Sequence, residues 1–353
     1  MHPYKSLPER NFWSTAVSGV SWPDMFKQEK AKFLISKDDI VSSAGSCFAQ
    51  RIAHQLHKLG YNFPNFEPPH PLLSPEEAHA LGYGMASARL GNVYTVKELR
   101  QLVEQVFALV EPKFLIRANR YGKWVDLLRP GVQKLGFTSY EEAFADRLYH
   151  LLRVREMFTQ TNVFVFTLGL TECWLTEDAS TAFGIHPEVA LGTDCEVKVQ
   201  RANLDYNTCY EDLIFVMRHL RSVNPTLRFV FTVSPVGLAA THQNKHVLVS
   251  TSYSKSVLRA VAGKVCDEHD FADYFMSYEI FNTAQSFGQY LSEDLRDISP
   301  RGLGAVMSTF TGMPSANTFI CGRLRETTAT TTSASNKAIT TGDAMTKPMA
   351  NIA

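Results

Sequence analysis

Two continuous apolar runs, residues 162–168 and 227–233, constrain the fold most strongly. Each is as long as a strand and lacks polar alternation, which is typical of strands covered on both faces in a parallel sheet. Helical periodicity surrounds them, and a short strand is expected at 273–275. The expected helices span residues 96–110, about 138–158, 210–223, 253–266 and 303–310, and residues 176–205 are expected to be irregular. This alternation predicts an α/β fold, a mainly parallel sheet in a three-layer α/β/α arrangement.

A serine stands where another expected strand meets a helix. The β-rich run 39–42 leads into the turn Ser42–Gln50, and an amphipathic helix follows, closed by Gly60. At such a corner Ser46 can expose its hydroxyl to the N–H groups of the first helical turn. Gly45 allows a sharp turn and the close approach of a substrate. A simple turn or a helix N-cap is the structural alternative for this serine.

Three segments are expected to meet at one edge of the sheet. Ser46, Gly169 and the pair Ser234-Pro235 each follow the carboxyl end of an expected strand. Ligands of open α/β sheets bind at this edge. The sequence therefore predicts a functional site there.

The segment Gly45-Ser46-Cys47-Phe48-Ala49 resembles the motif that names the GSCFA family, which is similar to the SGNH/GDSL hydrolases. Four further blocks resemble that family in its order, so the resemblance covers roughly residues 42–310. These blocks are Thr167-Leu168-Gly169-Leu170-Thr171-Glu172, Thr232-Val233-Ser234-Pro235-Val236, Tyr253-Ser254-Lys255-Ser256 and Ser277-Tyr278-Glu279-Ile280.

The resemblance implies a serine hydrolase or acyltransferase that acts on small acyl esters, with O-acetyl groups on carbohydrate as one substrate class. Ser46 would be the nucleophile and would form an acyl-enzyme, and no metal or organic cofactor is implied. The expected oxyanion donors are the N–H of Ser46, Gly91 or Asn92, and Thr171, which stands where related enzymes carry asparagine. Gly91-Asn92 is also a common turn.

The sequence departs from the pattern at the general base. SGNH-like enzymes carry Asp-x-x-His near the domain end, whereas this chain has Asp294-Leu295-Arg296-Asp297. Asp294 would then orient or assist a base from another loop, for which His242 and His246 are the candidates. The alternative is a carbohydrate-binding or scaffolding protein that keeps the fold and has lost turnover.

Four other side chains near the expected site have candidate roles. Glu172 could orient a neighbour or cap a strand end. Lys255, at the expected opening of a helix, could bind an anionic group, act as a desolvated base or lie on the surface. Glu279 could face the same edge. Cys47 could react as a thiolate or point into the core.

Composition limits the remaining classes. Lysine plus arginine equals aspartate plus glutamate, so we expect no nucleic-acid partner, and no apolar run is long enough for a membrane span. The six cysteines form no Cys-x-x-Cys pair, which favours a thiol-reduced, cytoplasmic protein without zinc. We expect three segments: an arm that packs on the domain (1–37), the α/β domain (38–312) and a low-complexity disordered tail (313–353). The oligomeric state stays open.

Overall fold

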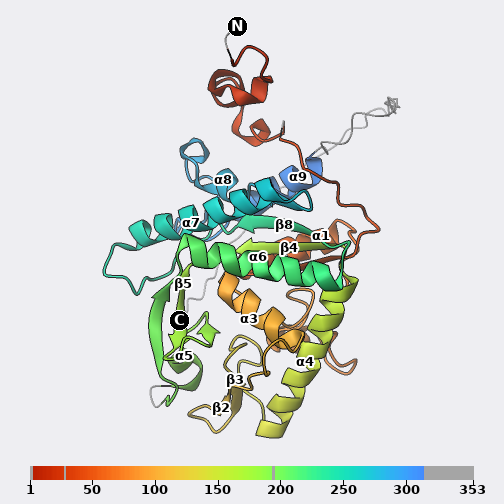
Figure 1. The fold of residues 1–353 in the computed structure, drawn as a ribbon, viewed down its shortest axis with the longest axis vertical. Coiled ribbons are helices and arrows are strands. Elements are labelled where there is room, and N and C mark those ends of the chain that lie inside the picture. Colours follow the sequence, from red (N-terminus) through yellow and green to blue (C-terminus); the bar gives the residue numbers. More distant parts are fainter. Residues whose placement is uncertain (1–2, 28, 193–194, 314–353) are drawn as a thin grey trace, which may run out of the picture. The chain divides into compact units, whose positions relative to one another are not determined.

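A four-stranded parallel sheet forms the centre of the computed structural model, which describes residues 3–27, 29–192 and 195–313 (Figure 1). Its strands lie in the order β1 (Val41–Gly45), β4 (Val163–Leu168), β8 (Arg228–Val233) and β9 (Ala272–Phe275). The two apolar runs are therefore β4 and β8, as predicted. Residue 45 pairs with residue 167, and residue 167 with residue 232, so the carboxyl ends of these strands share one edge.

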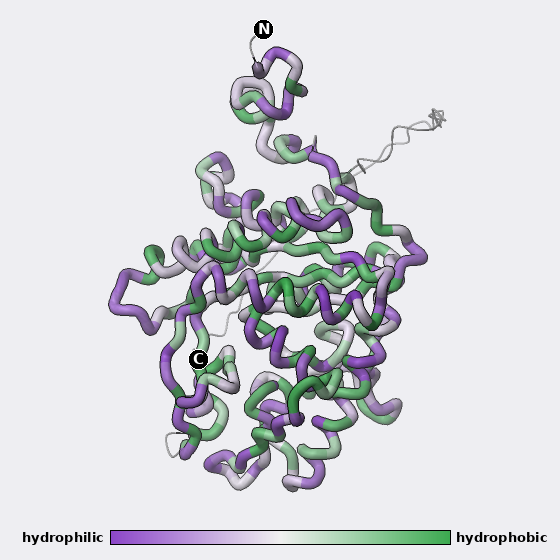
Figure 2. The backbone as a smooth tube through the Cα atoms, in the orientation of Figure 1, coloured by the Kyte–Doolittle hydropathy of each residue, from purple (hydrophilic) through white to green (hydrophobic). Residues whose placement is uncertain are grey.

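Alternate residues of β4 face different helical layers. Phe164 and Phe166 pack in one core with α3 (Val96–Val106), α4 (Tyr140–Gln160), α6 (Tyr206–Val223) and α7 (Val247–Glu268). Val163 and Val165 pack in a second core with α1 (Cys47–Lys58), α8 (Ser277–Asn282) and α9 (Pro300–Gly312). The side-chain period of two along a strand produces this division, and Figure 2 shows the strands as an apolar centre. The predicted three-layer α/β/α class is confirmed.

Helix α7 begins six residues before the sequence pattern suggests. The pattern places the opening near Tyr253, but His246 caps the helix instead, because its Nδ1 accepts a hydrogen bond from the backbone N–H of Leu248 at 3.2 Å. Lys255 therefore lies inside the helix, and its side chain is buried.

The region 176–205, expected to be irregular, contains much of a second sheet. Strand β5 (Glu172–Thr176) pairs antiparallel with β6 (Ala182–Phe183) and β7 (Val199–Asn203), and the short helix α5 (Pro187–Leu191) lies between the last two strands in sequence. These strands are short, and β7 is only half-buried, so neither hydrophobic pattern is strong enough to reveal them. The remaining small elements are α2 (Pro75–Ala80) and the hairpin β2 (Ile116–Ala118) with β3 (Trp124–Asp126).

The described part of the N-terminal arm contacts the sheet domain at several points. Its turns include 3-10 helices at Glu9–Asn11 and Trp22–Asp24 and a π-helical turn at Ser14–Ser18. The Trp22 ring lies 6.2 Å from that of Tyr290, and the backbone N–H of Lys32 donates to Asp273 at 2.8 Å. The domain boundaries stay predictions, and the expected tail lies outside the described residues except for Met313. Among the helices of residues 3–27, 29–192 and 195–313, none has the length and apolar character that a bilayer crossing needs.

Gly45 permits the corner between β1 and α1. Its φ is +141°, and a Cβ there would lie 2.7 Å from the Thr167 carbonyl oxygen and 2.8 Å from the Thr167 Cβ. We expect Gly45→Ala to lower the free energy of unfolding by about 2–4 kcal/mol, because backbone strain adds to a clash with a packed strand. Chemical denaturation measures this.

Gly60→Ala is the matched control for that measurement. Gly60 also has a positive φ, +71°, but a Cβ there would have no atom within 4 Å. It should cost only about 1 kcal/mol. Equal losses in the two variants would contradict the predicted clash at Gly45.

Candidate active site

The side chain of Ser46 does not cap the helix that it precedes. Ser46 occupies the N-cap position of α1 with an extended backbone, where serine normally accepts a hydrogen bond from the first turn, yet its side chain makes no capping bond. The residue is 5% exposed, and its Oγ is buried without a partner among the described residues. Buried hydroxyls are usually hydrogen-bonded, so an unused one at a helix N-terminus is a candidate reactive group.

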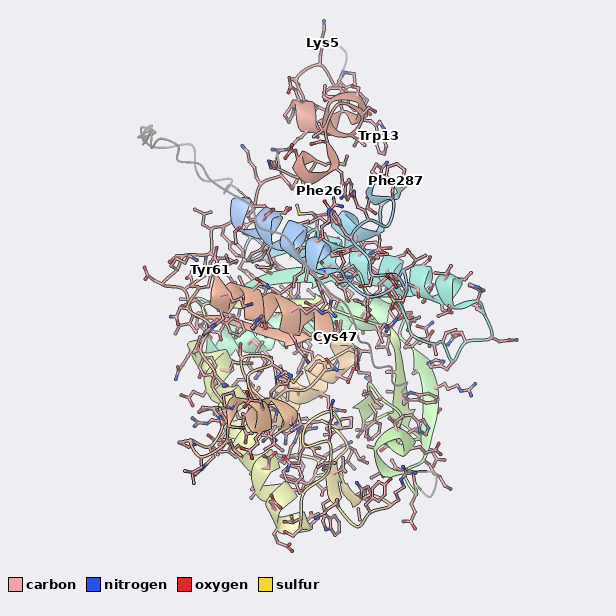
Figure 3. The ribbon with its side chains drawn as sticks, turned by 180° about the vertical axis from the view of Figure 1, so that it is seen from behind. Lys5, Trp13, Phe26, Cys47, Tyr61 and Phe287 are labelled. Carbon is pink, nitrogen blue, oxygen red and sulfur yellow. The ribbon has the colours of Figure 1, made fainter. Side chains whose placement is uncertain are left out.

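A pocket of about 240 Å³ opens at the carboxyl edge of the sheet. Its walls bring together Ser46, Gly169 and Ser234, which the sequence predicts at this edge because each follows the carboxyl end of an expected strand. Cys47, exposed and labelled at the start of α1 in Figure 3, is on the same wall. The other lining residues are Tyr94, Leu170, Gly184, Ile185, Val236, Gly237, Leu238, Ala239, Ala240 and Arg296.

The contacts of Gly169 leave no room for a side chain beside Ser46. A Cβ at Gly169 would lie 2.8 Å from the Tyr94 carbonyl oxygen and 3.6 Å from the Ser46 Cβ. That carbonyl accepts hydrogen bonds from the backbone N–H groups of Gly169 and Leu170, at 3.2 and 2.8 Å. The segment around Tyr94 is thereby fixed against the end of β4, and both of these N–H groups are engaged.

Lys255 is a buried amine that bonds to the wall residue Gly169 and, like the two histidines considered below, is not among the residues that line the pocket. Its Nζ donates to the Gly169 carbonyl oxygen at 2.6 Å, and the side chain is 1% exposed. Burial lowers the pKa of Lys255 to about 7, and the nearby charge of Arg296 acts in the same direction. A substantial fraction of the amine is therefore neutral near pH 7, and a neutral amine keeps a lone pair that can accept a proton.

Tyr94 lines the same pocket, and its hydroxyl makes a side-chain hydrogen bond. Its Oη accepts a hydrogen bond from the Asn92 side-chain amide at 2.9 Å, and burial raises the pKa of Tyr94 to about 12. The phenol therefore stays protonated at neutral pH and can donate. Asn92 itself lines an adjoining cavity, and Gly91, directly before it, has a positive φ of +68°. Neither Gly91 nor Asn92 is among the residues that line the Ser46 pocket.

Thr171 and Glu172 lie outside the lining of the pocket and have other partners. The Thr171 N–H donates to Ser254 Oγ at 3.0 Å, and its hydroxyl donates to Asn203 Oδ1 at 2.7 Å. Glu172 accepts from the Thr241 hydroxyl at 2.6 Å and from the His242 N–H at 3.0 Å. These bonds fix the loop after β8 against β5.

The two candidate histidines are also engaged in structural contacts. His242 Nε2 lies 3.1 Å from the Ala202 carbonyl oxygen and 3.4 Å from Glu172, and its ring packs on Trp174. His246 is exposed and caps α7. Neither is among the pocket-lining residues, and the described lining contains no histidine at all.

The segment that resembles Asp-x-x-His presents an arginine to the pocket. Asp294 is exposed, and its Oδ1 accepts from the backbone N–H groups of Arg296 and Asp297, at 3.1 and 2.9 Å. Arg296 lines the pocket, donates from Nε to the Gly237 carbonyl oxygen at 3.1 Å and pairs with Asp297 at 3.3 Å. Glu279 is paired elsewhere, with Arg259 at 2.6 Å and Tyr274 at 2.8 Å.

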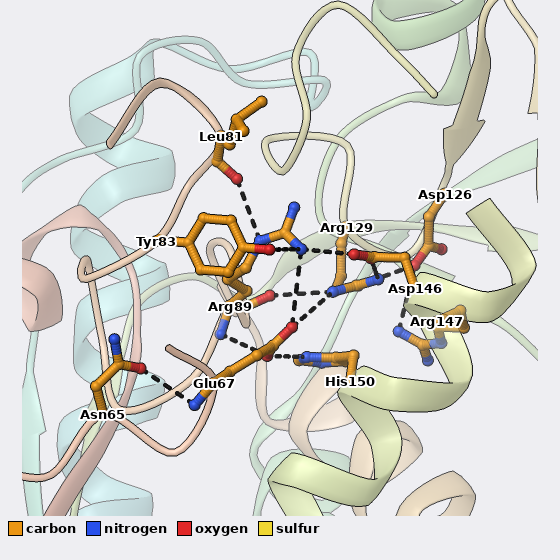
Figure 4. Close-up of polar contacts among 10 residues, drawn as sticks. All are labelled: Asn65, Glu67, Leu81, Tyr83, Arg89, Asp126, Arg129, Asp146, Arg147 and His150. Carbon is orange, nitrogen blue, oxygen red and sulfur yellow. Dashed lines mark hydrogen bonds and ion pairs between the residues drawn. The ribbon is translucent and has the colours of Figure 1, made fainter. Parts of the chain in front are cut away.

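A second polar cavity adjoins the pocket and shares Tyr94, Gly184 and Ile185 with it. Its lining includes Arg129, Arg147 and His150, part of the buried charge network drawn in Figure 4. The network members and their contacts are Arg129 to Asp126 (2.9 Å) and Asp146 (2.7 Å), Arg147 to Asp126 (3.5 Å), Arg89 to Asp146 (2.6 Å) and His150 to Glu67 (2.7 Å). Burial keeps the pKa of His150 well below its usual value, so this imidazole is neutral.

Sequence reasoning missed Tyr94 and Arg296 at the pocket and the whole network. Tyr94 directly follows the Gly91-Asn92-Val93 segment, and Arg296 is inside Asp294–Asp297. Both would have been found if the residues within and next to each motif had been considered as candidates. The network residues are spread over residues 67–150 without a local pattern, and only the fold brings them together. Within the described residues, no group of three or more His, Cys, Asp or Glu side chains is placed to hold a metal ion.

Fold and site together define a three-layer α/β/α protein with a pocket at the carboxyl edge of its sheet and a serine at a helix N-terminus in the pocket wall. The chain belongs to the GSCFA family, whose sequence profile matches residues 40–310. Among curated proteins, none matches the chain significantly.

Proposed function

We propose that this protein is a serine hydrolase or acyltransferase that acts on small acyl esters through a Ser46 acyl-enzyme. The observation that carries the proposal is the buried Ser46 hydroxyl, which makes no capping bond and has no described partner at the wall of the pocket. Family membership supports the class, and O-acetyl groups on carbohydrate are the substrates that the family resemblance suggests.

Lys255 is the proposed general base. The Ser46 oxygen attacks the acyl carbon while the neutral amine of Lys255 takes the hydroxyl proton. The tetrahedral intermediate then expels the alcohol, which receives that proton as the C–O bond breaks, and the acyl group stays on Ser46. Water or a second alcohol repeats the two steps in the deacylation. The lowered pKa of Lys255, about 7, suits this exchange at neutral pH.

Two kinds of donor support the oxyanion in this proposal. The first turn of α1, which includes Cys47, has N–H groups without intrahelical acceptors, and Tyr94 adds a protonated hydroxyl. Thr171 is replaced in this role because both of its donors are engaged. The Ser46 oxygen is covered, so Ser46 must change rotamer or a lining side chain must move before reaction.

A fluorophosphonate probe tests the nucleophile. We expect wild-type protein to be labelled and Ser46→Ala to lose at least about 1000-fold in labelling rate, because the attacking oxygen is absent. Ser234→Ala is the matched control: Ser234 lines the same pocket, and its Oγ accepts a hydrogen bond from the nearby backbone N–H of Val236 at 3.3 Å. That variant should label within about threefold of wild type. A folded wild-type protein that never labels would contradict the proposal.

A binding protein without turnover is the second candidate function. Asp297 stands where the resembling pattern has histidine, the described lining contains no imidazole, and the Ser46 oxygen is covered. This candidate predicts that an acylated carbohydrate protects the pocket from thiol modification at exposed Cys47 without being hydrolysed. Hydrolysis that depends on Ser46 would exclude it.

A further inference from the structure

Arg296 is the one charged side chain among the described residues that line the Ser46 pocket. A tight turn holds it there. Asp294 accepts the backbone N–H groups of Arg296 and Asp297, and the Ser292 N–H donates to the Asp297 carbonyl oxygen at 2.7 Å. Leu295, immediately before Arg296, takes a left-handed backbone with φ +54°. This turn fixes the direction in which the chain delivers Arg296.

The guanidinium of Arg296 has N–H donors without an acceptor among the described residues. Its bonds within the described residues are one from Nε to Gly237 and one from Nη1 to Asp297, at 3.1 and 3.3 Å, whereas an arginine has five N–H groups. The Asp297 side chain is 48% exposed, so solvent screens this pair and it holds the guanidinium only weakly. A planar fork with free N–H groups fits the two oxygens of a carboxylate or phosphate.

The pocket has no negative charge of its own to balance Arg296. No aspartate or glutamate is among its described lining residues, and the charge of Arg296 acts to lower the pKa values of both Lys255 and Tyr94. The rest of the wall near the arginine is apolar, with Val236, Leu238, Ala239 and Ala240 following Ser234. A ligand with a short apolar segment and an anionic end would match this wall.

We propose that the pocket selects acyl esters that carry an anionic oxygen group, such as a carboxylate, and that Arg296 binds that group. The inference rests on the proposed function for its chemistry, because the ester must reach Ser46. Asp294 then has a positioning role, because it binds the backbone of Arg296. In place of the histidine of Asp-x-x-His, the loop would supply an arginine that binds the substrate. The anionic group could belong to the acyl or to the alcohol part, and the test separates the two.

The test compares kcat/KM for three esters of similar size: a neutral butyrate ester, the hemisuccinate ester of the same alcohol, and a butyrate ester of an anionic alcohol. We expect wild type to prefer one anionic ester over the neutral one by about 10–100-fold at low salt, with the preference falling as salt rises. Arg296→Gln should lose that preference, which is measured as the ratio of kcat/KM for two esters in the same protein, so that a change in the basal rate through the Lys255 pKa cancels. Asp297→Asn, which removes the competing carboxylate, should keep or increase it.

A binding measurement keeps the inference separate from turnover. Calorimetry of each of the two anionic esters against Ser46→Ala, and against Ser46→Ala with Arg296→Gln, reports the anionic contact without any reaction. We expect the double variant to bind at least tenfold more weakly. If binding depends on Arg296 but the wild-type protein hydrolyses none of the esters, only the proposed function is contradicted. Equal binding by both proteins, or the same ester preference in wild type and Arg296→Gln, would overturn the role of Arg296.

Discussion

Lys255→Met is expected to lower kcat/KM for ester hydrolysis by about 100- to 10,000-fold, because the variant has no group to take the Ser46 proton. In wild type, kcat/KM should rise with pH through about 7, as the amine loses its proton, and the variant should lack this inflection. The pH profile is the decisive measurement, because a protonated Lys255 that only stabilised the oxyanion would give a rate that falls above pH 7.

The same variant is expected to be more stable than wild type at neutral pH. The pKa of Lys255 is about 7 in the folded protein and 10.5 in its ordinary state, so between these values the unfolded chain binds one more proton. Wild-type stability should therefore rise with pH across this window, and the burial penalty is fully present below pH 7. Allowing for the lost bond to Gly169, we expect Lys255→Met to gain about 2 kcal/mol at pH 7.

Lys264→Met is the control on the same helix. The Lys264 side chain is 53% exposed and pairs with Glu268 at 2.7 Å, a surface ion pair that contributes little to stability. The control should stay within about 0.5 kcal/mol of wild type and keep its activity. A Lys255→Met protein that is less stable than wild type across pH 6–9, with an unchanged rate profile, would show that the amine is a structural ion.

Asp126→Ala is expected to destabilise the protein by about 3–5 kcal/mol. Asp126 is 3% exposed, accepts from Arg129 Nε at 2.9 Å and lies 3.5 Å from Arg147 (Figure 4). Removing the carboxylate would leave two buried guanidinium groups short of a counter-charge. Burial acts to raise the pKa of Asp126, but the charges of Arg147 and Arg129 keep it below its usual value.

The sign of that pKa shift sets the pH dependence. Because the folded-state pKa is lower than the ordinary value of 3.8, the stabilising contribution is present above that value and is lost as pH falls through the folded pKa. Urea denaturation at pH 7 and in the acid range measures both effects. Asp267→Ala, at an exposed position of α7, should change stability by less than about 0.5 kcal/mol. A loss as small at Asp126 would contradict the account of the network.

The core of the fold could be predicted because its signal is local and periodic. The runs that form β4 and β8 are buried on both faces. Because Ser46, Gly169 and Ser234 each follow an expected strand directly, the sequence predicts that they share one edge. The prediction for residues 176–205 was wrong because β5, β6 and β7 are short, and β7 is only half-buried. Their pairing depends on contacts with other strands, which a local sequence pattern cannot identify.

The site could be predicted in part, and the reason is similar. The position of Ser46 follows from a strand, a glycine and a helix in direct succession. The burial of Lys255 depends on α7 starting at Val247, which in turn depends on a histidine cap that resembles any loop histidine. Tyr94 and Arg296 reach the pocket on loops, whose direction is set by contacts with residues far away in sequence, such as Gly169 and Gly237.

The central claim is that the Ser46 oxygen carries the acyl group. The most direct measurement mixes wild-type protein with an activated ester, quenches the reaction in acid within milliseconds to seconds, and maps the added mass by peptide mass spectrometry. We expect one acyl group on the peptide that contains Ser46, at Ser46 rather than Cys47, and none in Ser46→Ala. An ester hydrolysed at the same rate by both proteins, or an acyl group found on Cys47 alone, would contradict it.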